Sequence, residues 1–138
     1  MQVRTATRED HAALVKLAAK SKYTKSFSSM MFSNEGIYAK GWITLVEADG
    51  EPVGLLCVRH KVRSPKSIIY FMVTHPDYRG QGIGKLMMDD LEEKTPHKTI
   101  ELSVMNDNPG GRAFWERMGF EPVGEAYKGK GTQMEKQL

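Results

Sequence analysis

The sequence predicts an α/β protein with a mixed sheet flanked by helices. Segments with the length and apolar content of strands alternate along the chain with segments of helical periodicity. One run, from Ile68 to Val73, is continuously apolar and rich in β-branched and aromatic residues, which is typical of a strand buried on both faces. Because no linker or repeat interrupts the 138 residues, we expect a single domain over residues 1–138.

The composition excludes several classes of protein. With 40% hydrophobic and 27% charged residues, the chain is neither disordered nor fibrous. Its one cysteine excludes an intrachain disulfide, and its 4 histidines lack metal-ligand spacing, so no metal is expected. It has neither an apolar run long enough to span a membrane nor a signal-peptide core, so we expect a cytoplasmic protein without membrane partners. The net charge of +3 suits an anionic ligand without indicating nucleic acid.

The N-terminal third predicts one strand followed by helices. The first strand covers Gln2 to Thr5, and Thr7 then begins a helix that extends to about Lys20. A second helix with apolar anchors is predicted after residue 21, ended by the segment Asn34 to Gly36. The aromatic and methionine residues of this second helix are expected to pack on the core, and direct contact with the substrate is the alternative.

Two strands connected by a tight turn follow, at Trp42 to Ala48 and at Pro52 to His60. The turn contains Asp49 and Gly50, a pair that tolerates the positive φ angles of a hairpin. Cys57 lies in the second strand without a neighbouring base, so we expect it to pack in the core rather than act as a nucleophile. The basic segment Arg59 to Lys66 is either a solvated hairpin end or a surface for an acidic partner.

The C-terminal third predicts a strand, a capped helix and a closing hairpin. The strand covers Thr99 to Met105, with alternate residues apolar. Asn108 suits the N-cap of a helix and Pro109 its first turn, whereas Gly119 suits the residue that ends it. The predicted strands of the closing hairpin are Phe120 to Val123 and Thr132 to Glu135.

The segment between the apolar run and the next helix has the features of a phosphate-binding turn. We refer to this segment, Arg79 to Gly84, as the glycine loop, because glycine alternates through it. The run Leu86 to Lys94 is predicted as a helix, with Ile83, Met87 and Leu91 at helical spacing. The glycines therefore leave backbone N–H groups open at the positive end of this helix. Arg79 and Lys85 add positive charge. A glycine-rich turn without a ligand is the alternative.

Two well-known phosphate-binding patterns do not fit this loop. A Walker loop requires glycine where Arg79 stands and serine or threonine where Leu86 stands. A Rossmann fingerprint places its third glycine at Lys85. The loop is therefore predicted to bind an anion by neither of these patterns.

Two segments carry motifs in a recognisable order. The first is V-x-x-P-x-Y-R-G-Q-G-I-G, from Val73 to Gly84, and the second is N-x-x-G-R-A-F-W-E-R-M-G-F, from Asn108 to Phe120. They resemble the acetyl-coenzyme A motif and the later motif of the GNAT superfamily of N-acetyltransferases. The resemblance implies a GNAT-like acyl-CoA N-acyltransferase fold, a single domain with a mixed, mostly antiparallel sheet, and acetyl-CoA as co-substrate.

The resemblance also implies which residues bind the cofactor. The pyrophosphate would contact backbone N–H groups of the glycine loop, and the pantetheine arm would run beside Met72 and Val73 like an added strand. Asn108 would hold the arm. The predicted cofactor-binding residues are Met72, Val73, Arg79, Gly80, Gln81, Gly82, Ile83, Gly84, Lys85 and Asn108.

The groups that move protons are less well defined by the sequence. The family's later motif commonly carries a tyrosine as general acid, and this chain has Trp115 there, whose indole is no acid at neutral pH. Tyr70 or Tyr127 would then act as the acid, or the thiolate leaves unprotonated. Glu101 is a candidate base, as are Glu47 and His75. The catalytic candidates are therefore Tyr70, Glu101 and Tyr127, and none is assigned.

The sequence thus predicts an N-acetyltransferase that moves the acetyl group of acetyl-CoA to a primary amine, by direct attack in a ternary complex. The alternative is a non-catalytic module of the same fold that binds or senses acyl-CoA. We expect a small-molecule or peptide amine as acceptor, no nucleic acid partner, and a monomer or homodimer.

Overall fold

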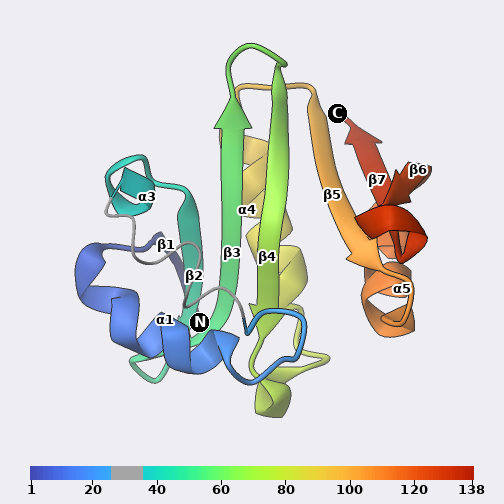
Figure 1. Ribbon diagram of the computed structural model, residues 1–138. Coiled ribbons are helices and arrows are strands. Elements are labelled where there is room, and N and C mark those ends of the chain that lie inside the picture. Colours follow the sequence, from blue (N-terminus) through green and yellow to red (C-terminus); the bar gives the residue numbers. More distant parts are fainter. Residues whose placement is uncertain (26–35) are drawn as a thin grey trace. The chain divides into compact units, whose positions relative to one another are not determined.

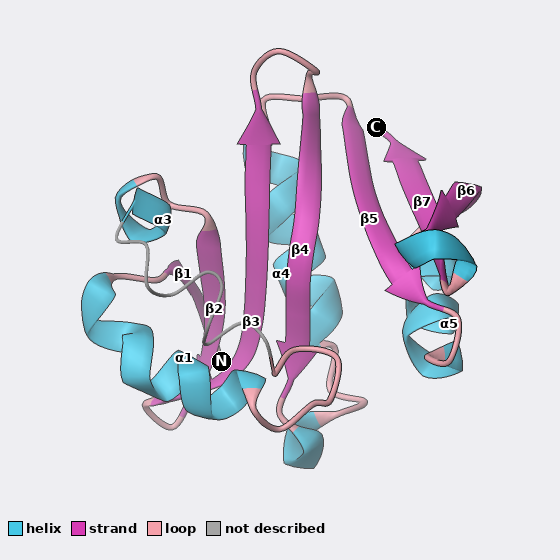
Figure 2. Ribbon diagram, viewed as in Figure 1, coloured by secondary structure: helices cyan, strands magenta, loops and turns pink. Residues whose placement is uncertain are grey.

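The computed structural model describes residues 1–25 and 36–138, and these residues form a seven-stranded sheet with helices (Figures 1 and 2). The strand order is β1-β2-β3-β4-β5-β7-β6. The pairs β1–β2, β2–β3, β5–β7 and β6–β7 are antiparallel, whereas β4–β5 is parallel. The predicted mixed, mostly antiparallel α/β fold is confirmed.

The elements have the following bounds. The strands are β1 (Gln2–Thr5), β2 (Ile43–Ala48), β3 (Glu51–Lys61), β4 (Lys66–Thr74), β5 (Thr99–Met105), β6 (Glu121–Ala126) and β7 (Gly131–Gln137). The α-helices are α1 (His11–Ala18), α3 (Gly36–Ala39), α4 (Ile83–Lys94) and α5 (Pro109–Arg117), and the 3-10 turns are η1 (Arg8–Asp10), η2 (Pro76–Tyr78) and η3 (Tyr127–Gly129). No helix in the described ranges is long and apolar enough to cross a membrane.

The chain divides into two compact units. The first contains Met1–Val58 and Phe71–Glu93, and the second contains Arg59–Tyr70 and Lys94–Leu138. Strands β3 and β4 each contribute residues to both units. The prediction of a single domain stays a prediction.

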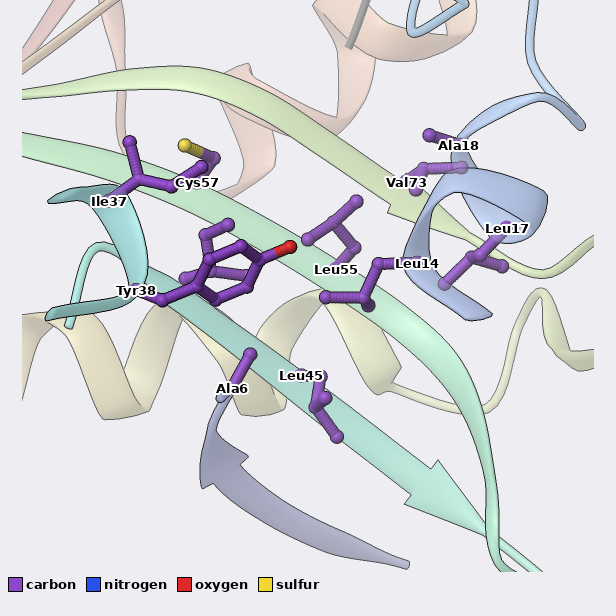
Figure 3. Close-up of a cluster of buried hydrophobic side chains, with 11 residues drawn as sticks. Ala6, Leu14, Leu17, Ala18, Ile37, Tyr38, Leu45, Leu55, Cys57 and Val73 are labelled. Atoms are coloured by element: carbon purple, nitrogen blue, oxygen red, sulfur yellow. The ribbon is translucent and has the colours of Figure 1, made fainter. Parts of the chain in front are cut away.

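The first unit has a hydrophobic core between α1, α3 and the neighbouring strands (Figure 3). Leu14 and Leu17 from α1 meet Leu45 from β2 and Leu55 from β3, and all four side chains are buried. Cys57 is fully buried in the same cluster, as its position in the predicted strand indicated. Burial of this apolar surface is the main source of stability for the unit.

Helix α4 packs on β3 at a point where only glycine fits. A Cβ added to Gly54 would lie 2.5 Å from Cγ2 of Ile83 and 3.2 Å from Cε of Met87. Ile83 is the first residue of α4, so this contact holds the beginning of the helix against the strand. The absence of a side chain at position 54 therefore determines how closely α4 approaches.

The second unit is built on β5, β7 and α5. Ile100, Leu102 and Val104 alternate along β5 and are buried, as predicted. Helix α5 is capped as predicted, because the Asn108 side chain accepts a hydrogen bond from the Gly111 N–H at 3.0 Å. Gly119, at φ 96°, ends the helix in the left-handed conformation.

Two details of the prediction are wrong. Strand β4 is not buried on both faces, since Tyr70 in its middle is 41% exposed. Gly36 begins the short helix α3 instead of ending a helix. The second helix predicted before it lies mainly outside the described residues.

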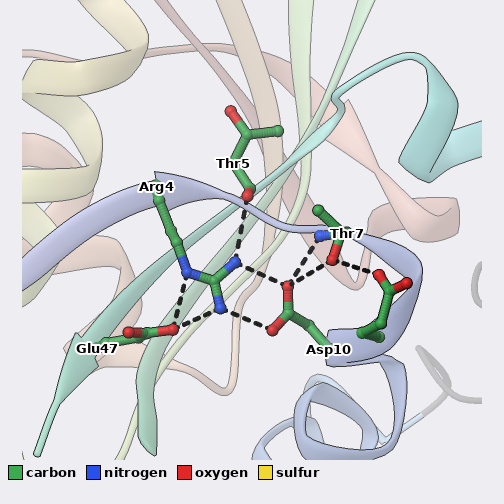
Figure 4. Close-up of polar contacts among 6 residues, drawn as sticks. Arg4, Thr5, Thr7, Asp10 and Glu47 are labelled. Atoms are coloured by element: carbon green, nitrogen blue, oxygen red, sulfur yellow. Dashed lines mark hydrogen bonds and ion pairs between the residues drawn. The ribbon is translucent and has the colours of Figure 1, made fainter. Parts of the chain in front are cut away.

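An ion-pair network joins the first strands to the first helical turn (Figure 4). The Arg4 guanidinium donates to both carboxylate oxygens of Asp10, at 2.8 and 2.7 Å, and its Nε donates to Glu47 at 2.8 Å. Asp10 also accepts from the Thr7 N–H at 2.8 Å. The hydrogen bond from Arg4 holds the pKa of the Asp10 carboxyl below its usual value.

We expect Gly54→Ala to destabilise the protein by about 1 to 3 kcal/mol, because its methyl group would overlap Ile83 and Met87. Chemical denaturation measures the free energy of unfolding. The matched control is Gly124→Ala on β6, where an added Cβ meets nothing within 4 Å. An equal loss in both variants would show that contact with α4 does not explain the effect.

Asp10→Asn tests the ion-pair network through its pH dependence. Because the folded pKa of Asp10 is depressed, its contribution is complete above about pH 5 and is lost as pH falls through 4 and below. We expect the variant to lose about 1 to 2 kcal/mol at pH 7 and progressively less toward pH 3. Asp77→Asn is the control, since the Asp77 side chain is 85% exposed. If the difference in the free energy of unfolding between Asp10→Asn and the wild type did not change with pH, the ion pair of Asp10 would not explain it.

Candidate functional site

The connection between β4 and α4 begins with a fixed turn. The His75 N–H donates to the Val53 carbonyl oxygen at 2.8 Å, which ties the end of β4 to β3. The His75 ring then caps η2, because its Nδ1 accepts from the Asp77 N–H at 3.1 Å. His75 therefore has a structural role, which weakens its candidacy as a general base.

The glycine loop that follows has an open backbone. Gly80 and Gly82 have φ angles of 79° and 78°, a conformation that favours glycine. An added Cβ at either position would meet no atom within 4 Å, so the space beside the backbone is open. The first hydrogen bond of α4 runs from the Leu86 N–H to the Gly82 carbonyl oxygen at 3.0 Å. The N–H groups before Leu86 thus lack intrahelical acceptors at the positive end of the helix.

Positive side chains flank these N–H groups. Arg79 is exposed at the start of the loop, and Gln81 is exposed within it. Lys85 pairs with Asp89 at 2.9 Å one turn along α4, and this hydrogen bond raises the pKa of Lys85, which is already charged at neutral pH. The loop therefore combines backbone donors with two cations, the combination that a phosphate group requires.

Strand β4 leads directly to this loop. It pairs with β5 through Lys66–Thr99, Ser67–Ile100 and Ile68–Glu101. Met72 and Val73 lie beyond this paired stretch, at the end of β4 nearest the loop. The Val73 side chain is buried in the core of the first unit, which fixes the backbone at this position.

Asn108 belongs to the second unit, where its side-chain oxygen Oδ1 accepts the hydrogen bond from the Gly111 N–H and caps α5. A Cβ at Gly111 would lie 2.4 Å from Nδ2 of Asn108, so glycine is needed for this side-chain position. The cap uses Oδ1 and not Nδ2. That Asn108 binds the cofactor stays a prediction.

The catalytic candidates have different surroundings. The Glu101 carboxylate accepts from Lys66 Nζ at 3.3 Å and from Gln133 Nε2 at 3.0 Å. Tyr70 is 41% exposed on β4, and Tyr127 is 55% exposed in the turn before β7. Glu101 is therefore already engaged in a structural network, whereas the two tyrosines are accessible.

Two further residues considered from the sequence have structural roles. Glu47 accepts hydrogen bonds from Arg4, as described above. Trp115, which stands where the family motif commonly has tyrosine, is 8% exposed. Its ring packs edge-on against Phe114 and Phe120, with centroid distances of 4.9 and 5.3 Å. Trp115 is thus a core residue of the second unit.

Sequence reasoning missed a buried polar chain in the second unit. His60 Nδ1 lies 2.6 Å from Ser67 Oγ, which lies 2.6 Å from Thr95 Oγ1. Ser67 is fully buried, and burial, with a smaller contribution from His97, lowers the pKa of His60. Nothing in the local sequence pattern indicates contacts between residues 28 positions apart.

It also missed a cleft of about 370 Å³ in the first unit. Residues of α1, the β2–β3 turn and η2 line this cleft, among them Lys16, Asp49 and Tyr78. None of the predicted cofactor-binding residues lines it. The cleft is therefore lined by residues outside the glycine loop.

Comparisons with known proteins identify the family. The model of the acetyltransferase (GNAT) family matches residues 7–120. The 5-NmdU N-acetyltransferase of Pseudomonas phage PaMx11 is 40% identical over 136 residues, which cover 98% of this chain and 97% of that protein. This extent of similarity shows common family membership along almost the whole chain.

Solved structures have the same fold. The PaiA N-acetyltransferase from Thermoplasma acidophilum, in complex with coenzyme A, matches with a TM-score of 0.81 at 20% identity, covering 99% of this chain and 98% of that one. Ard1 from Thermoplasma volcanium matches with a TM-score of 0.84 at 16% identity, covering 99% and 97%. At these identities the likeness shows the fold alone.

The chain belongs to the acetyltransferase (GNAT) family. Within that family it is an N-acetyltransferase, and its acetyl donor is acetyl-CoA. The family, the fold and the enzyme class predicted from the sequence are confirmed.

The described residues fit the donor in two respects. The open space beside Gly80 and Gly82, with N–H groups and cations around it, suits a pyrophosphate. The end of β4 at Met72 and Val73 offers extended backbone to an amide-containing arm.

We expect Cys57 to resist alkylation in the folded protein. Burial raises the pKa of its thiol to about 12, so at pH 8 the reactive thiolate is about 10⁻⁴ of the total. Mass spectrometry after iodoacetamide treatment measures the modification, and the same treatment in denaturant is the control. Rapid labelling without denaturant would contradict this burial.

Proposed function

We propose that this acetyltransferase acetylates the primary amine of a nucleotide-linked acceptor of the 5-NmdU type. The observation that carries the proposal is the similarity to the 5-NmdU N-acetyltransferase, which extends over nearly the full length of both chains. The proposal replaces the broader expectation of a small-molecule or peptide amine. Solved structures of the same fold do not distinguish between acceptors.

The proposed cofactor contacts in the first unit come mainly from the backbone. The N–H groups of the glycine loop bind the pyrophosphate, and Arg79 and Lys85 add long-range attraction. Backbone groups of Met72 and Val73 pair with the pantetheine arm and orient its thioester. An N–H of this segment also stabilises negative charge that develops on the acetyl oxygen.

We propose direct transfer within a ternary complex, because neither Cys57 nor Ser67 is available as a nucleophile. Cys57 is fully buried with a raised thiol pKa, and Ser67 is fully buried and bonded to Thr95 and His60. Neither side chain is placed to accept an acetyl group. In the proposed step the amine nitrogen of the acceptor attacks the acetyl carbon itself and the carbon–sulfur bond breaks. The nitrogen loses one proton, and coenzyme A leaves as a thiol or thiolate.

Among the catalytic candidates, Tyr70 is the one we propose as the proton donor to the departing thiolate. It is accessible, and it lies two residues before Met72 on β4. The Glu101 carboxylate already accepts hydrogen bonds from Lys66 and Gln133. The acceptor amine must be unprotonated when it attacks, because ammonium has no lone pair.

Incubation of the protein with acetyl-CoA and 5-NmdU tests the proposal. We expect coenzyme A release, measured as free thiol, and an acetylated product, measured by mass spectrometry. We expect Gly82→Ala to raise the KM for acetyl-CoA at least tenfold, because its methyl group would enter the open space of the loop and its φ angle of 78° disfavours alanine.

Gly50→Ala is the matched control. Gly50 has a φ angle of 79° and open space around it, but it lies in the β2–β3 turn, outside the glycine loop. Both variants carry the same backbone strain, so equal rises in KM would contradict a role of the loop in binding. Coenzyme A binding without any transfer to 5-NmdU would instead contradict the proposed acceptor.

A further inference from the structure

The turn between β6 and β7 has an unusual backbone. Tyr127, Lys128 and Gly129 have φ angles of 53°, 55° and 87°, so consecutive residues adopt the left-handed conformation. Residues other than glycine are disfavoured in this conformation, yet Tyr127 and Lys128 both have large side chains. Such strain persists only where the surrounding structure enforces it, and it occurs often at binding sites.

Hydrogen bonds from neighbouring elements hold this turn in place. Asn106, at the end of β5, donates from Nδ2 to the Gly129 carbonyl oxygen at 3.2 Å and from its backbone N–H to the Lys130 carbonyl oxygen at 2.9 Å. Its own side-chain oxygen accepts from Thr132 Oγ1 at 2.8 Å. The turn is therefore tied to the strands on which the second unit is built.

The Tyr127 ring is fixed at one edge and accessible elsewhere. A Cβ added to Gly131 would lie 2.4 Å from Cδ2 of Tyr127 and 3.0 Å from the Val104 carbonyl oxygen. Glycine at position 131 thus lets the ring lie close against the strand. The residue is nevertheless 55% exposed, and within the described part of the chain its hydroxyl has no hydrogen-bond partner. The turn therefore presents an aromatic surface to solvent.

Two basic residues follow Tyr127 closely in the sequence. Lys128 and Lys130 are both exposed, and neither forms an ion pair with a described residue. An exposed aromatic ring in a turn with two lysines matches the chemistry of a nucleotide, whose base can stack on the ring and whose phosphate can meet the cations. A simple aliphatic amine has neither a base nor a phosphate.

We propose that Tyr127 is a stacking surface for the base of the acceptor nucleotide, and that Lys128 and Lys130 contact its phosphate. This inference rests on the proposed function, because it names how the nucleotide-linked acceptor is recognised. It differs from the sequence-based hypothesis that Tyr127 is a general acid. Stacking requires the ring, whereas acid catalysis requires the hydroxyl.

Kinetics of two Tyr127 variants separate these roles. We expect Tyr127→Ala to raise the KM for 5-NmdU about 5- to 100-fold with little change in kcat, and Tyr127→Phe to restore the KM. The KM for a simple aliphatic amine should change less than twofold in Tyr127→Ala. If Tyr127→Phe instead slows turnover by about two orders of magnitude or more, the proposal is overturned in favour of acid catalysis.

Val123→Ala is the control for loss of exposed apolar surface, because Val123 is 53% exposed on β6 and outside the turn. It should leave the KM for 5-NmdU unchanged. If Val123→Ala and Tyr127→Ala raise this KM equally, or if Tyr127→Ala raises the KM for every amine equally, the stacking surface is excluded.

Direct binding separates this inference from the proposed function. Deoxyuridine monophosphate and a short single-stranded deoxyuridine oligonucleotide are titrated without acetyl-CoA. We expect Tyr127→Ala to weaken binding of these probes about 5- to 100-fold. We expect the double variant Lys128→Gln, Lys130→Gln to lose affinity at low salt, and the loss relative to the wild type should become smaller as the salt concentration rises. If the oligonucleotide binds more tightly than the monophosphate, the acceptor nucleotide belongs to a strand. If the two probes bind equally, the acceptor is a free nucleotide.

These titrations distinguish failure of the stacking surface from failure of the proposed acceptor. If the wild-type protein binds neither probe, or if Tyr127→Ala binds both as well as the wild type, the stacking surface is wrong whatever the enzyme acetylates. If binding depends on Tyr127 but no acetyl group is transferred to 5-NmdU, the surface stands and the proposed acceptor is wrong.

Discussion

The close contact between β3 and α4 is the constraint on which the proposed cofactor site depends. Without a side chain at Gly54, the first residue of α4 lies directly against the strand, and Met87 packs one turn later. The glycine loop ends where this helix begins. The position of its N–H groups is therefore set by a packing contact in the core and not by a polar interaction within the loop.

A site built from backbone groups places few demands on side-chain identity. Gly80 and Gly82 are needed for their conformation, whereas the N–H groups proposed to contact phosphate are present at every residue except proline. Chains of the same fold share as little as 16–20% of their residues with this one. The acceptor side, for which we propose side chains such as Tyr127, is free to differ.

Much of the fold could be predicted because its signals are local. Capping by Asn108, termination at Gly119 and the turn at Asp49 and Gly50 all follow from conformational preferences of single residues. A helix after the glycine loop could be predicted because a glycine-rich turn precedes an amphipathic segment, and α4 lies there. These features depend on neighbours within about four positions.

Other features could not be predicted because they depend on partners far apart in the sequence. Arg4 meets Glu47 across 43 positions, and Lys66 meets Glu135 across 69. The exposure of Tyr70 depends on how the strands around it are covered, which an apolar run does not reveal. The open turn of the glycine loop was recognisable from its glycines. The left-handed conformation of Tyr127 was not, since glycine is the residue expected there.

The burial of Cys57 has a practical consequence for enzymology. Acetyl transfer releases coenzyme A, whose thiol is detected with colorimetric thiol reagents. Since the sequence has one cysteine and its side chain is fully buried in the core, the folded enzyme contributes almost no background to such a reading. Continuous turnover can therefore be followed at high enzyme concentration, which makes slow acceptors and weakened variants accessible to measurement.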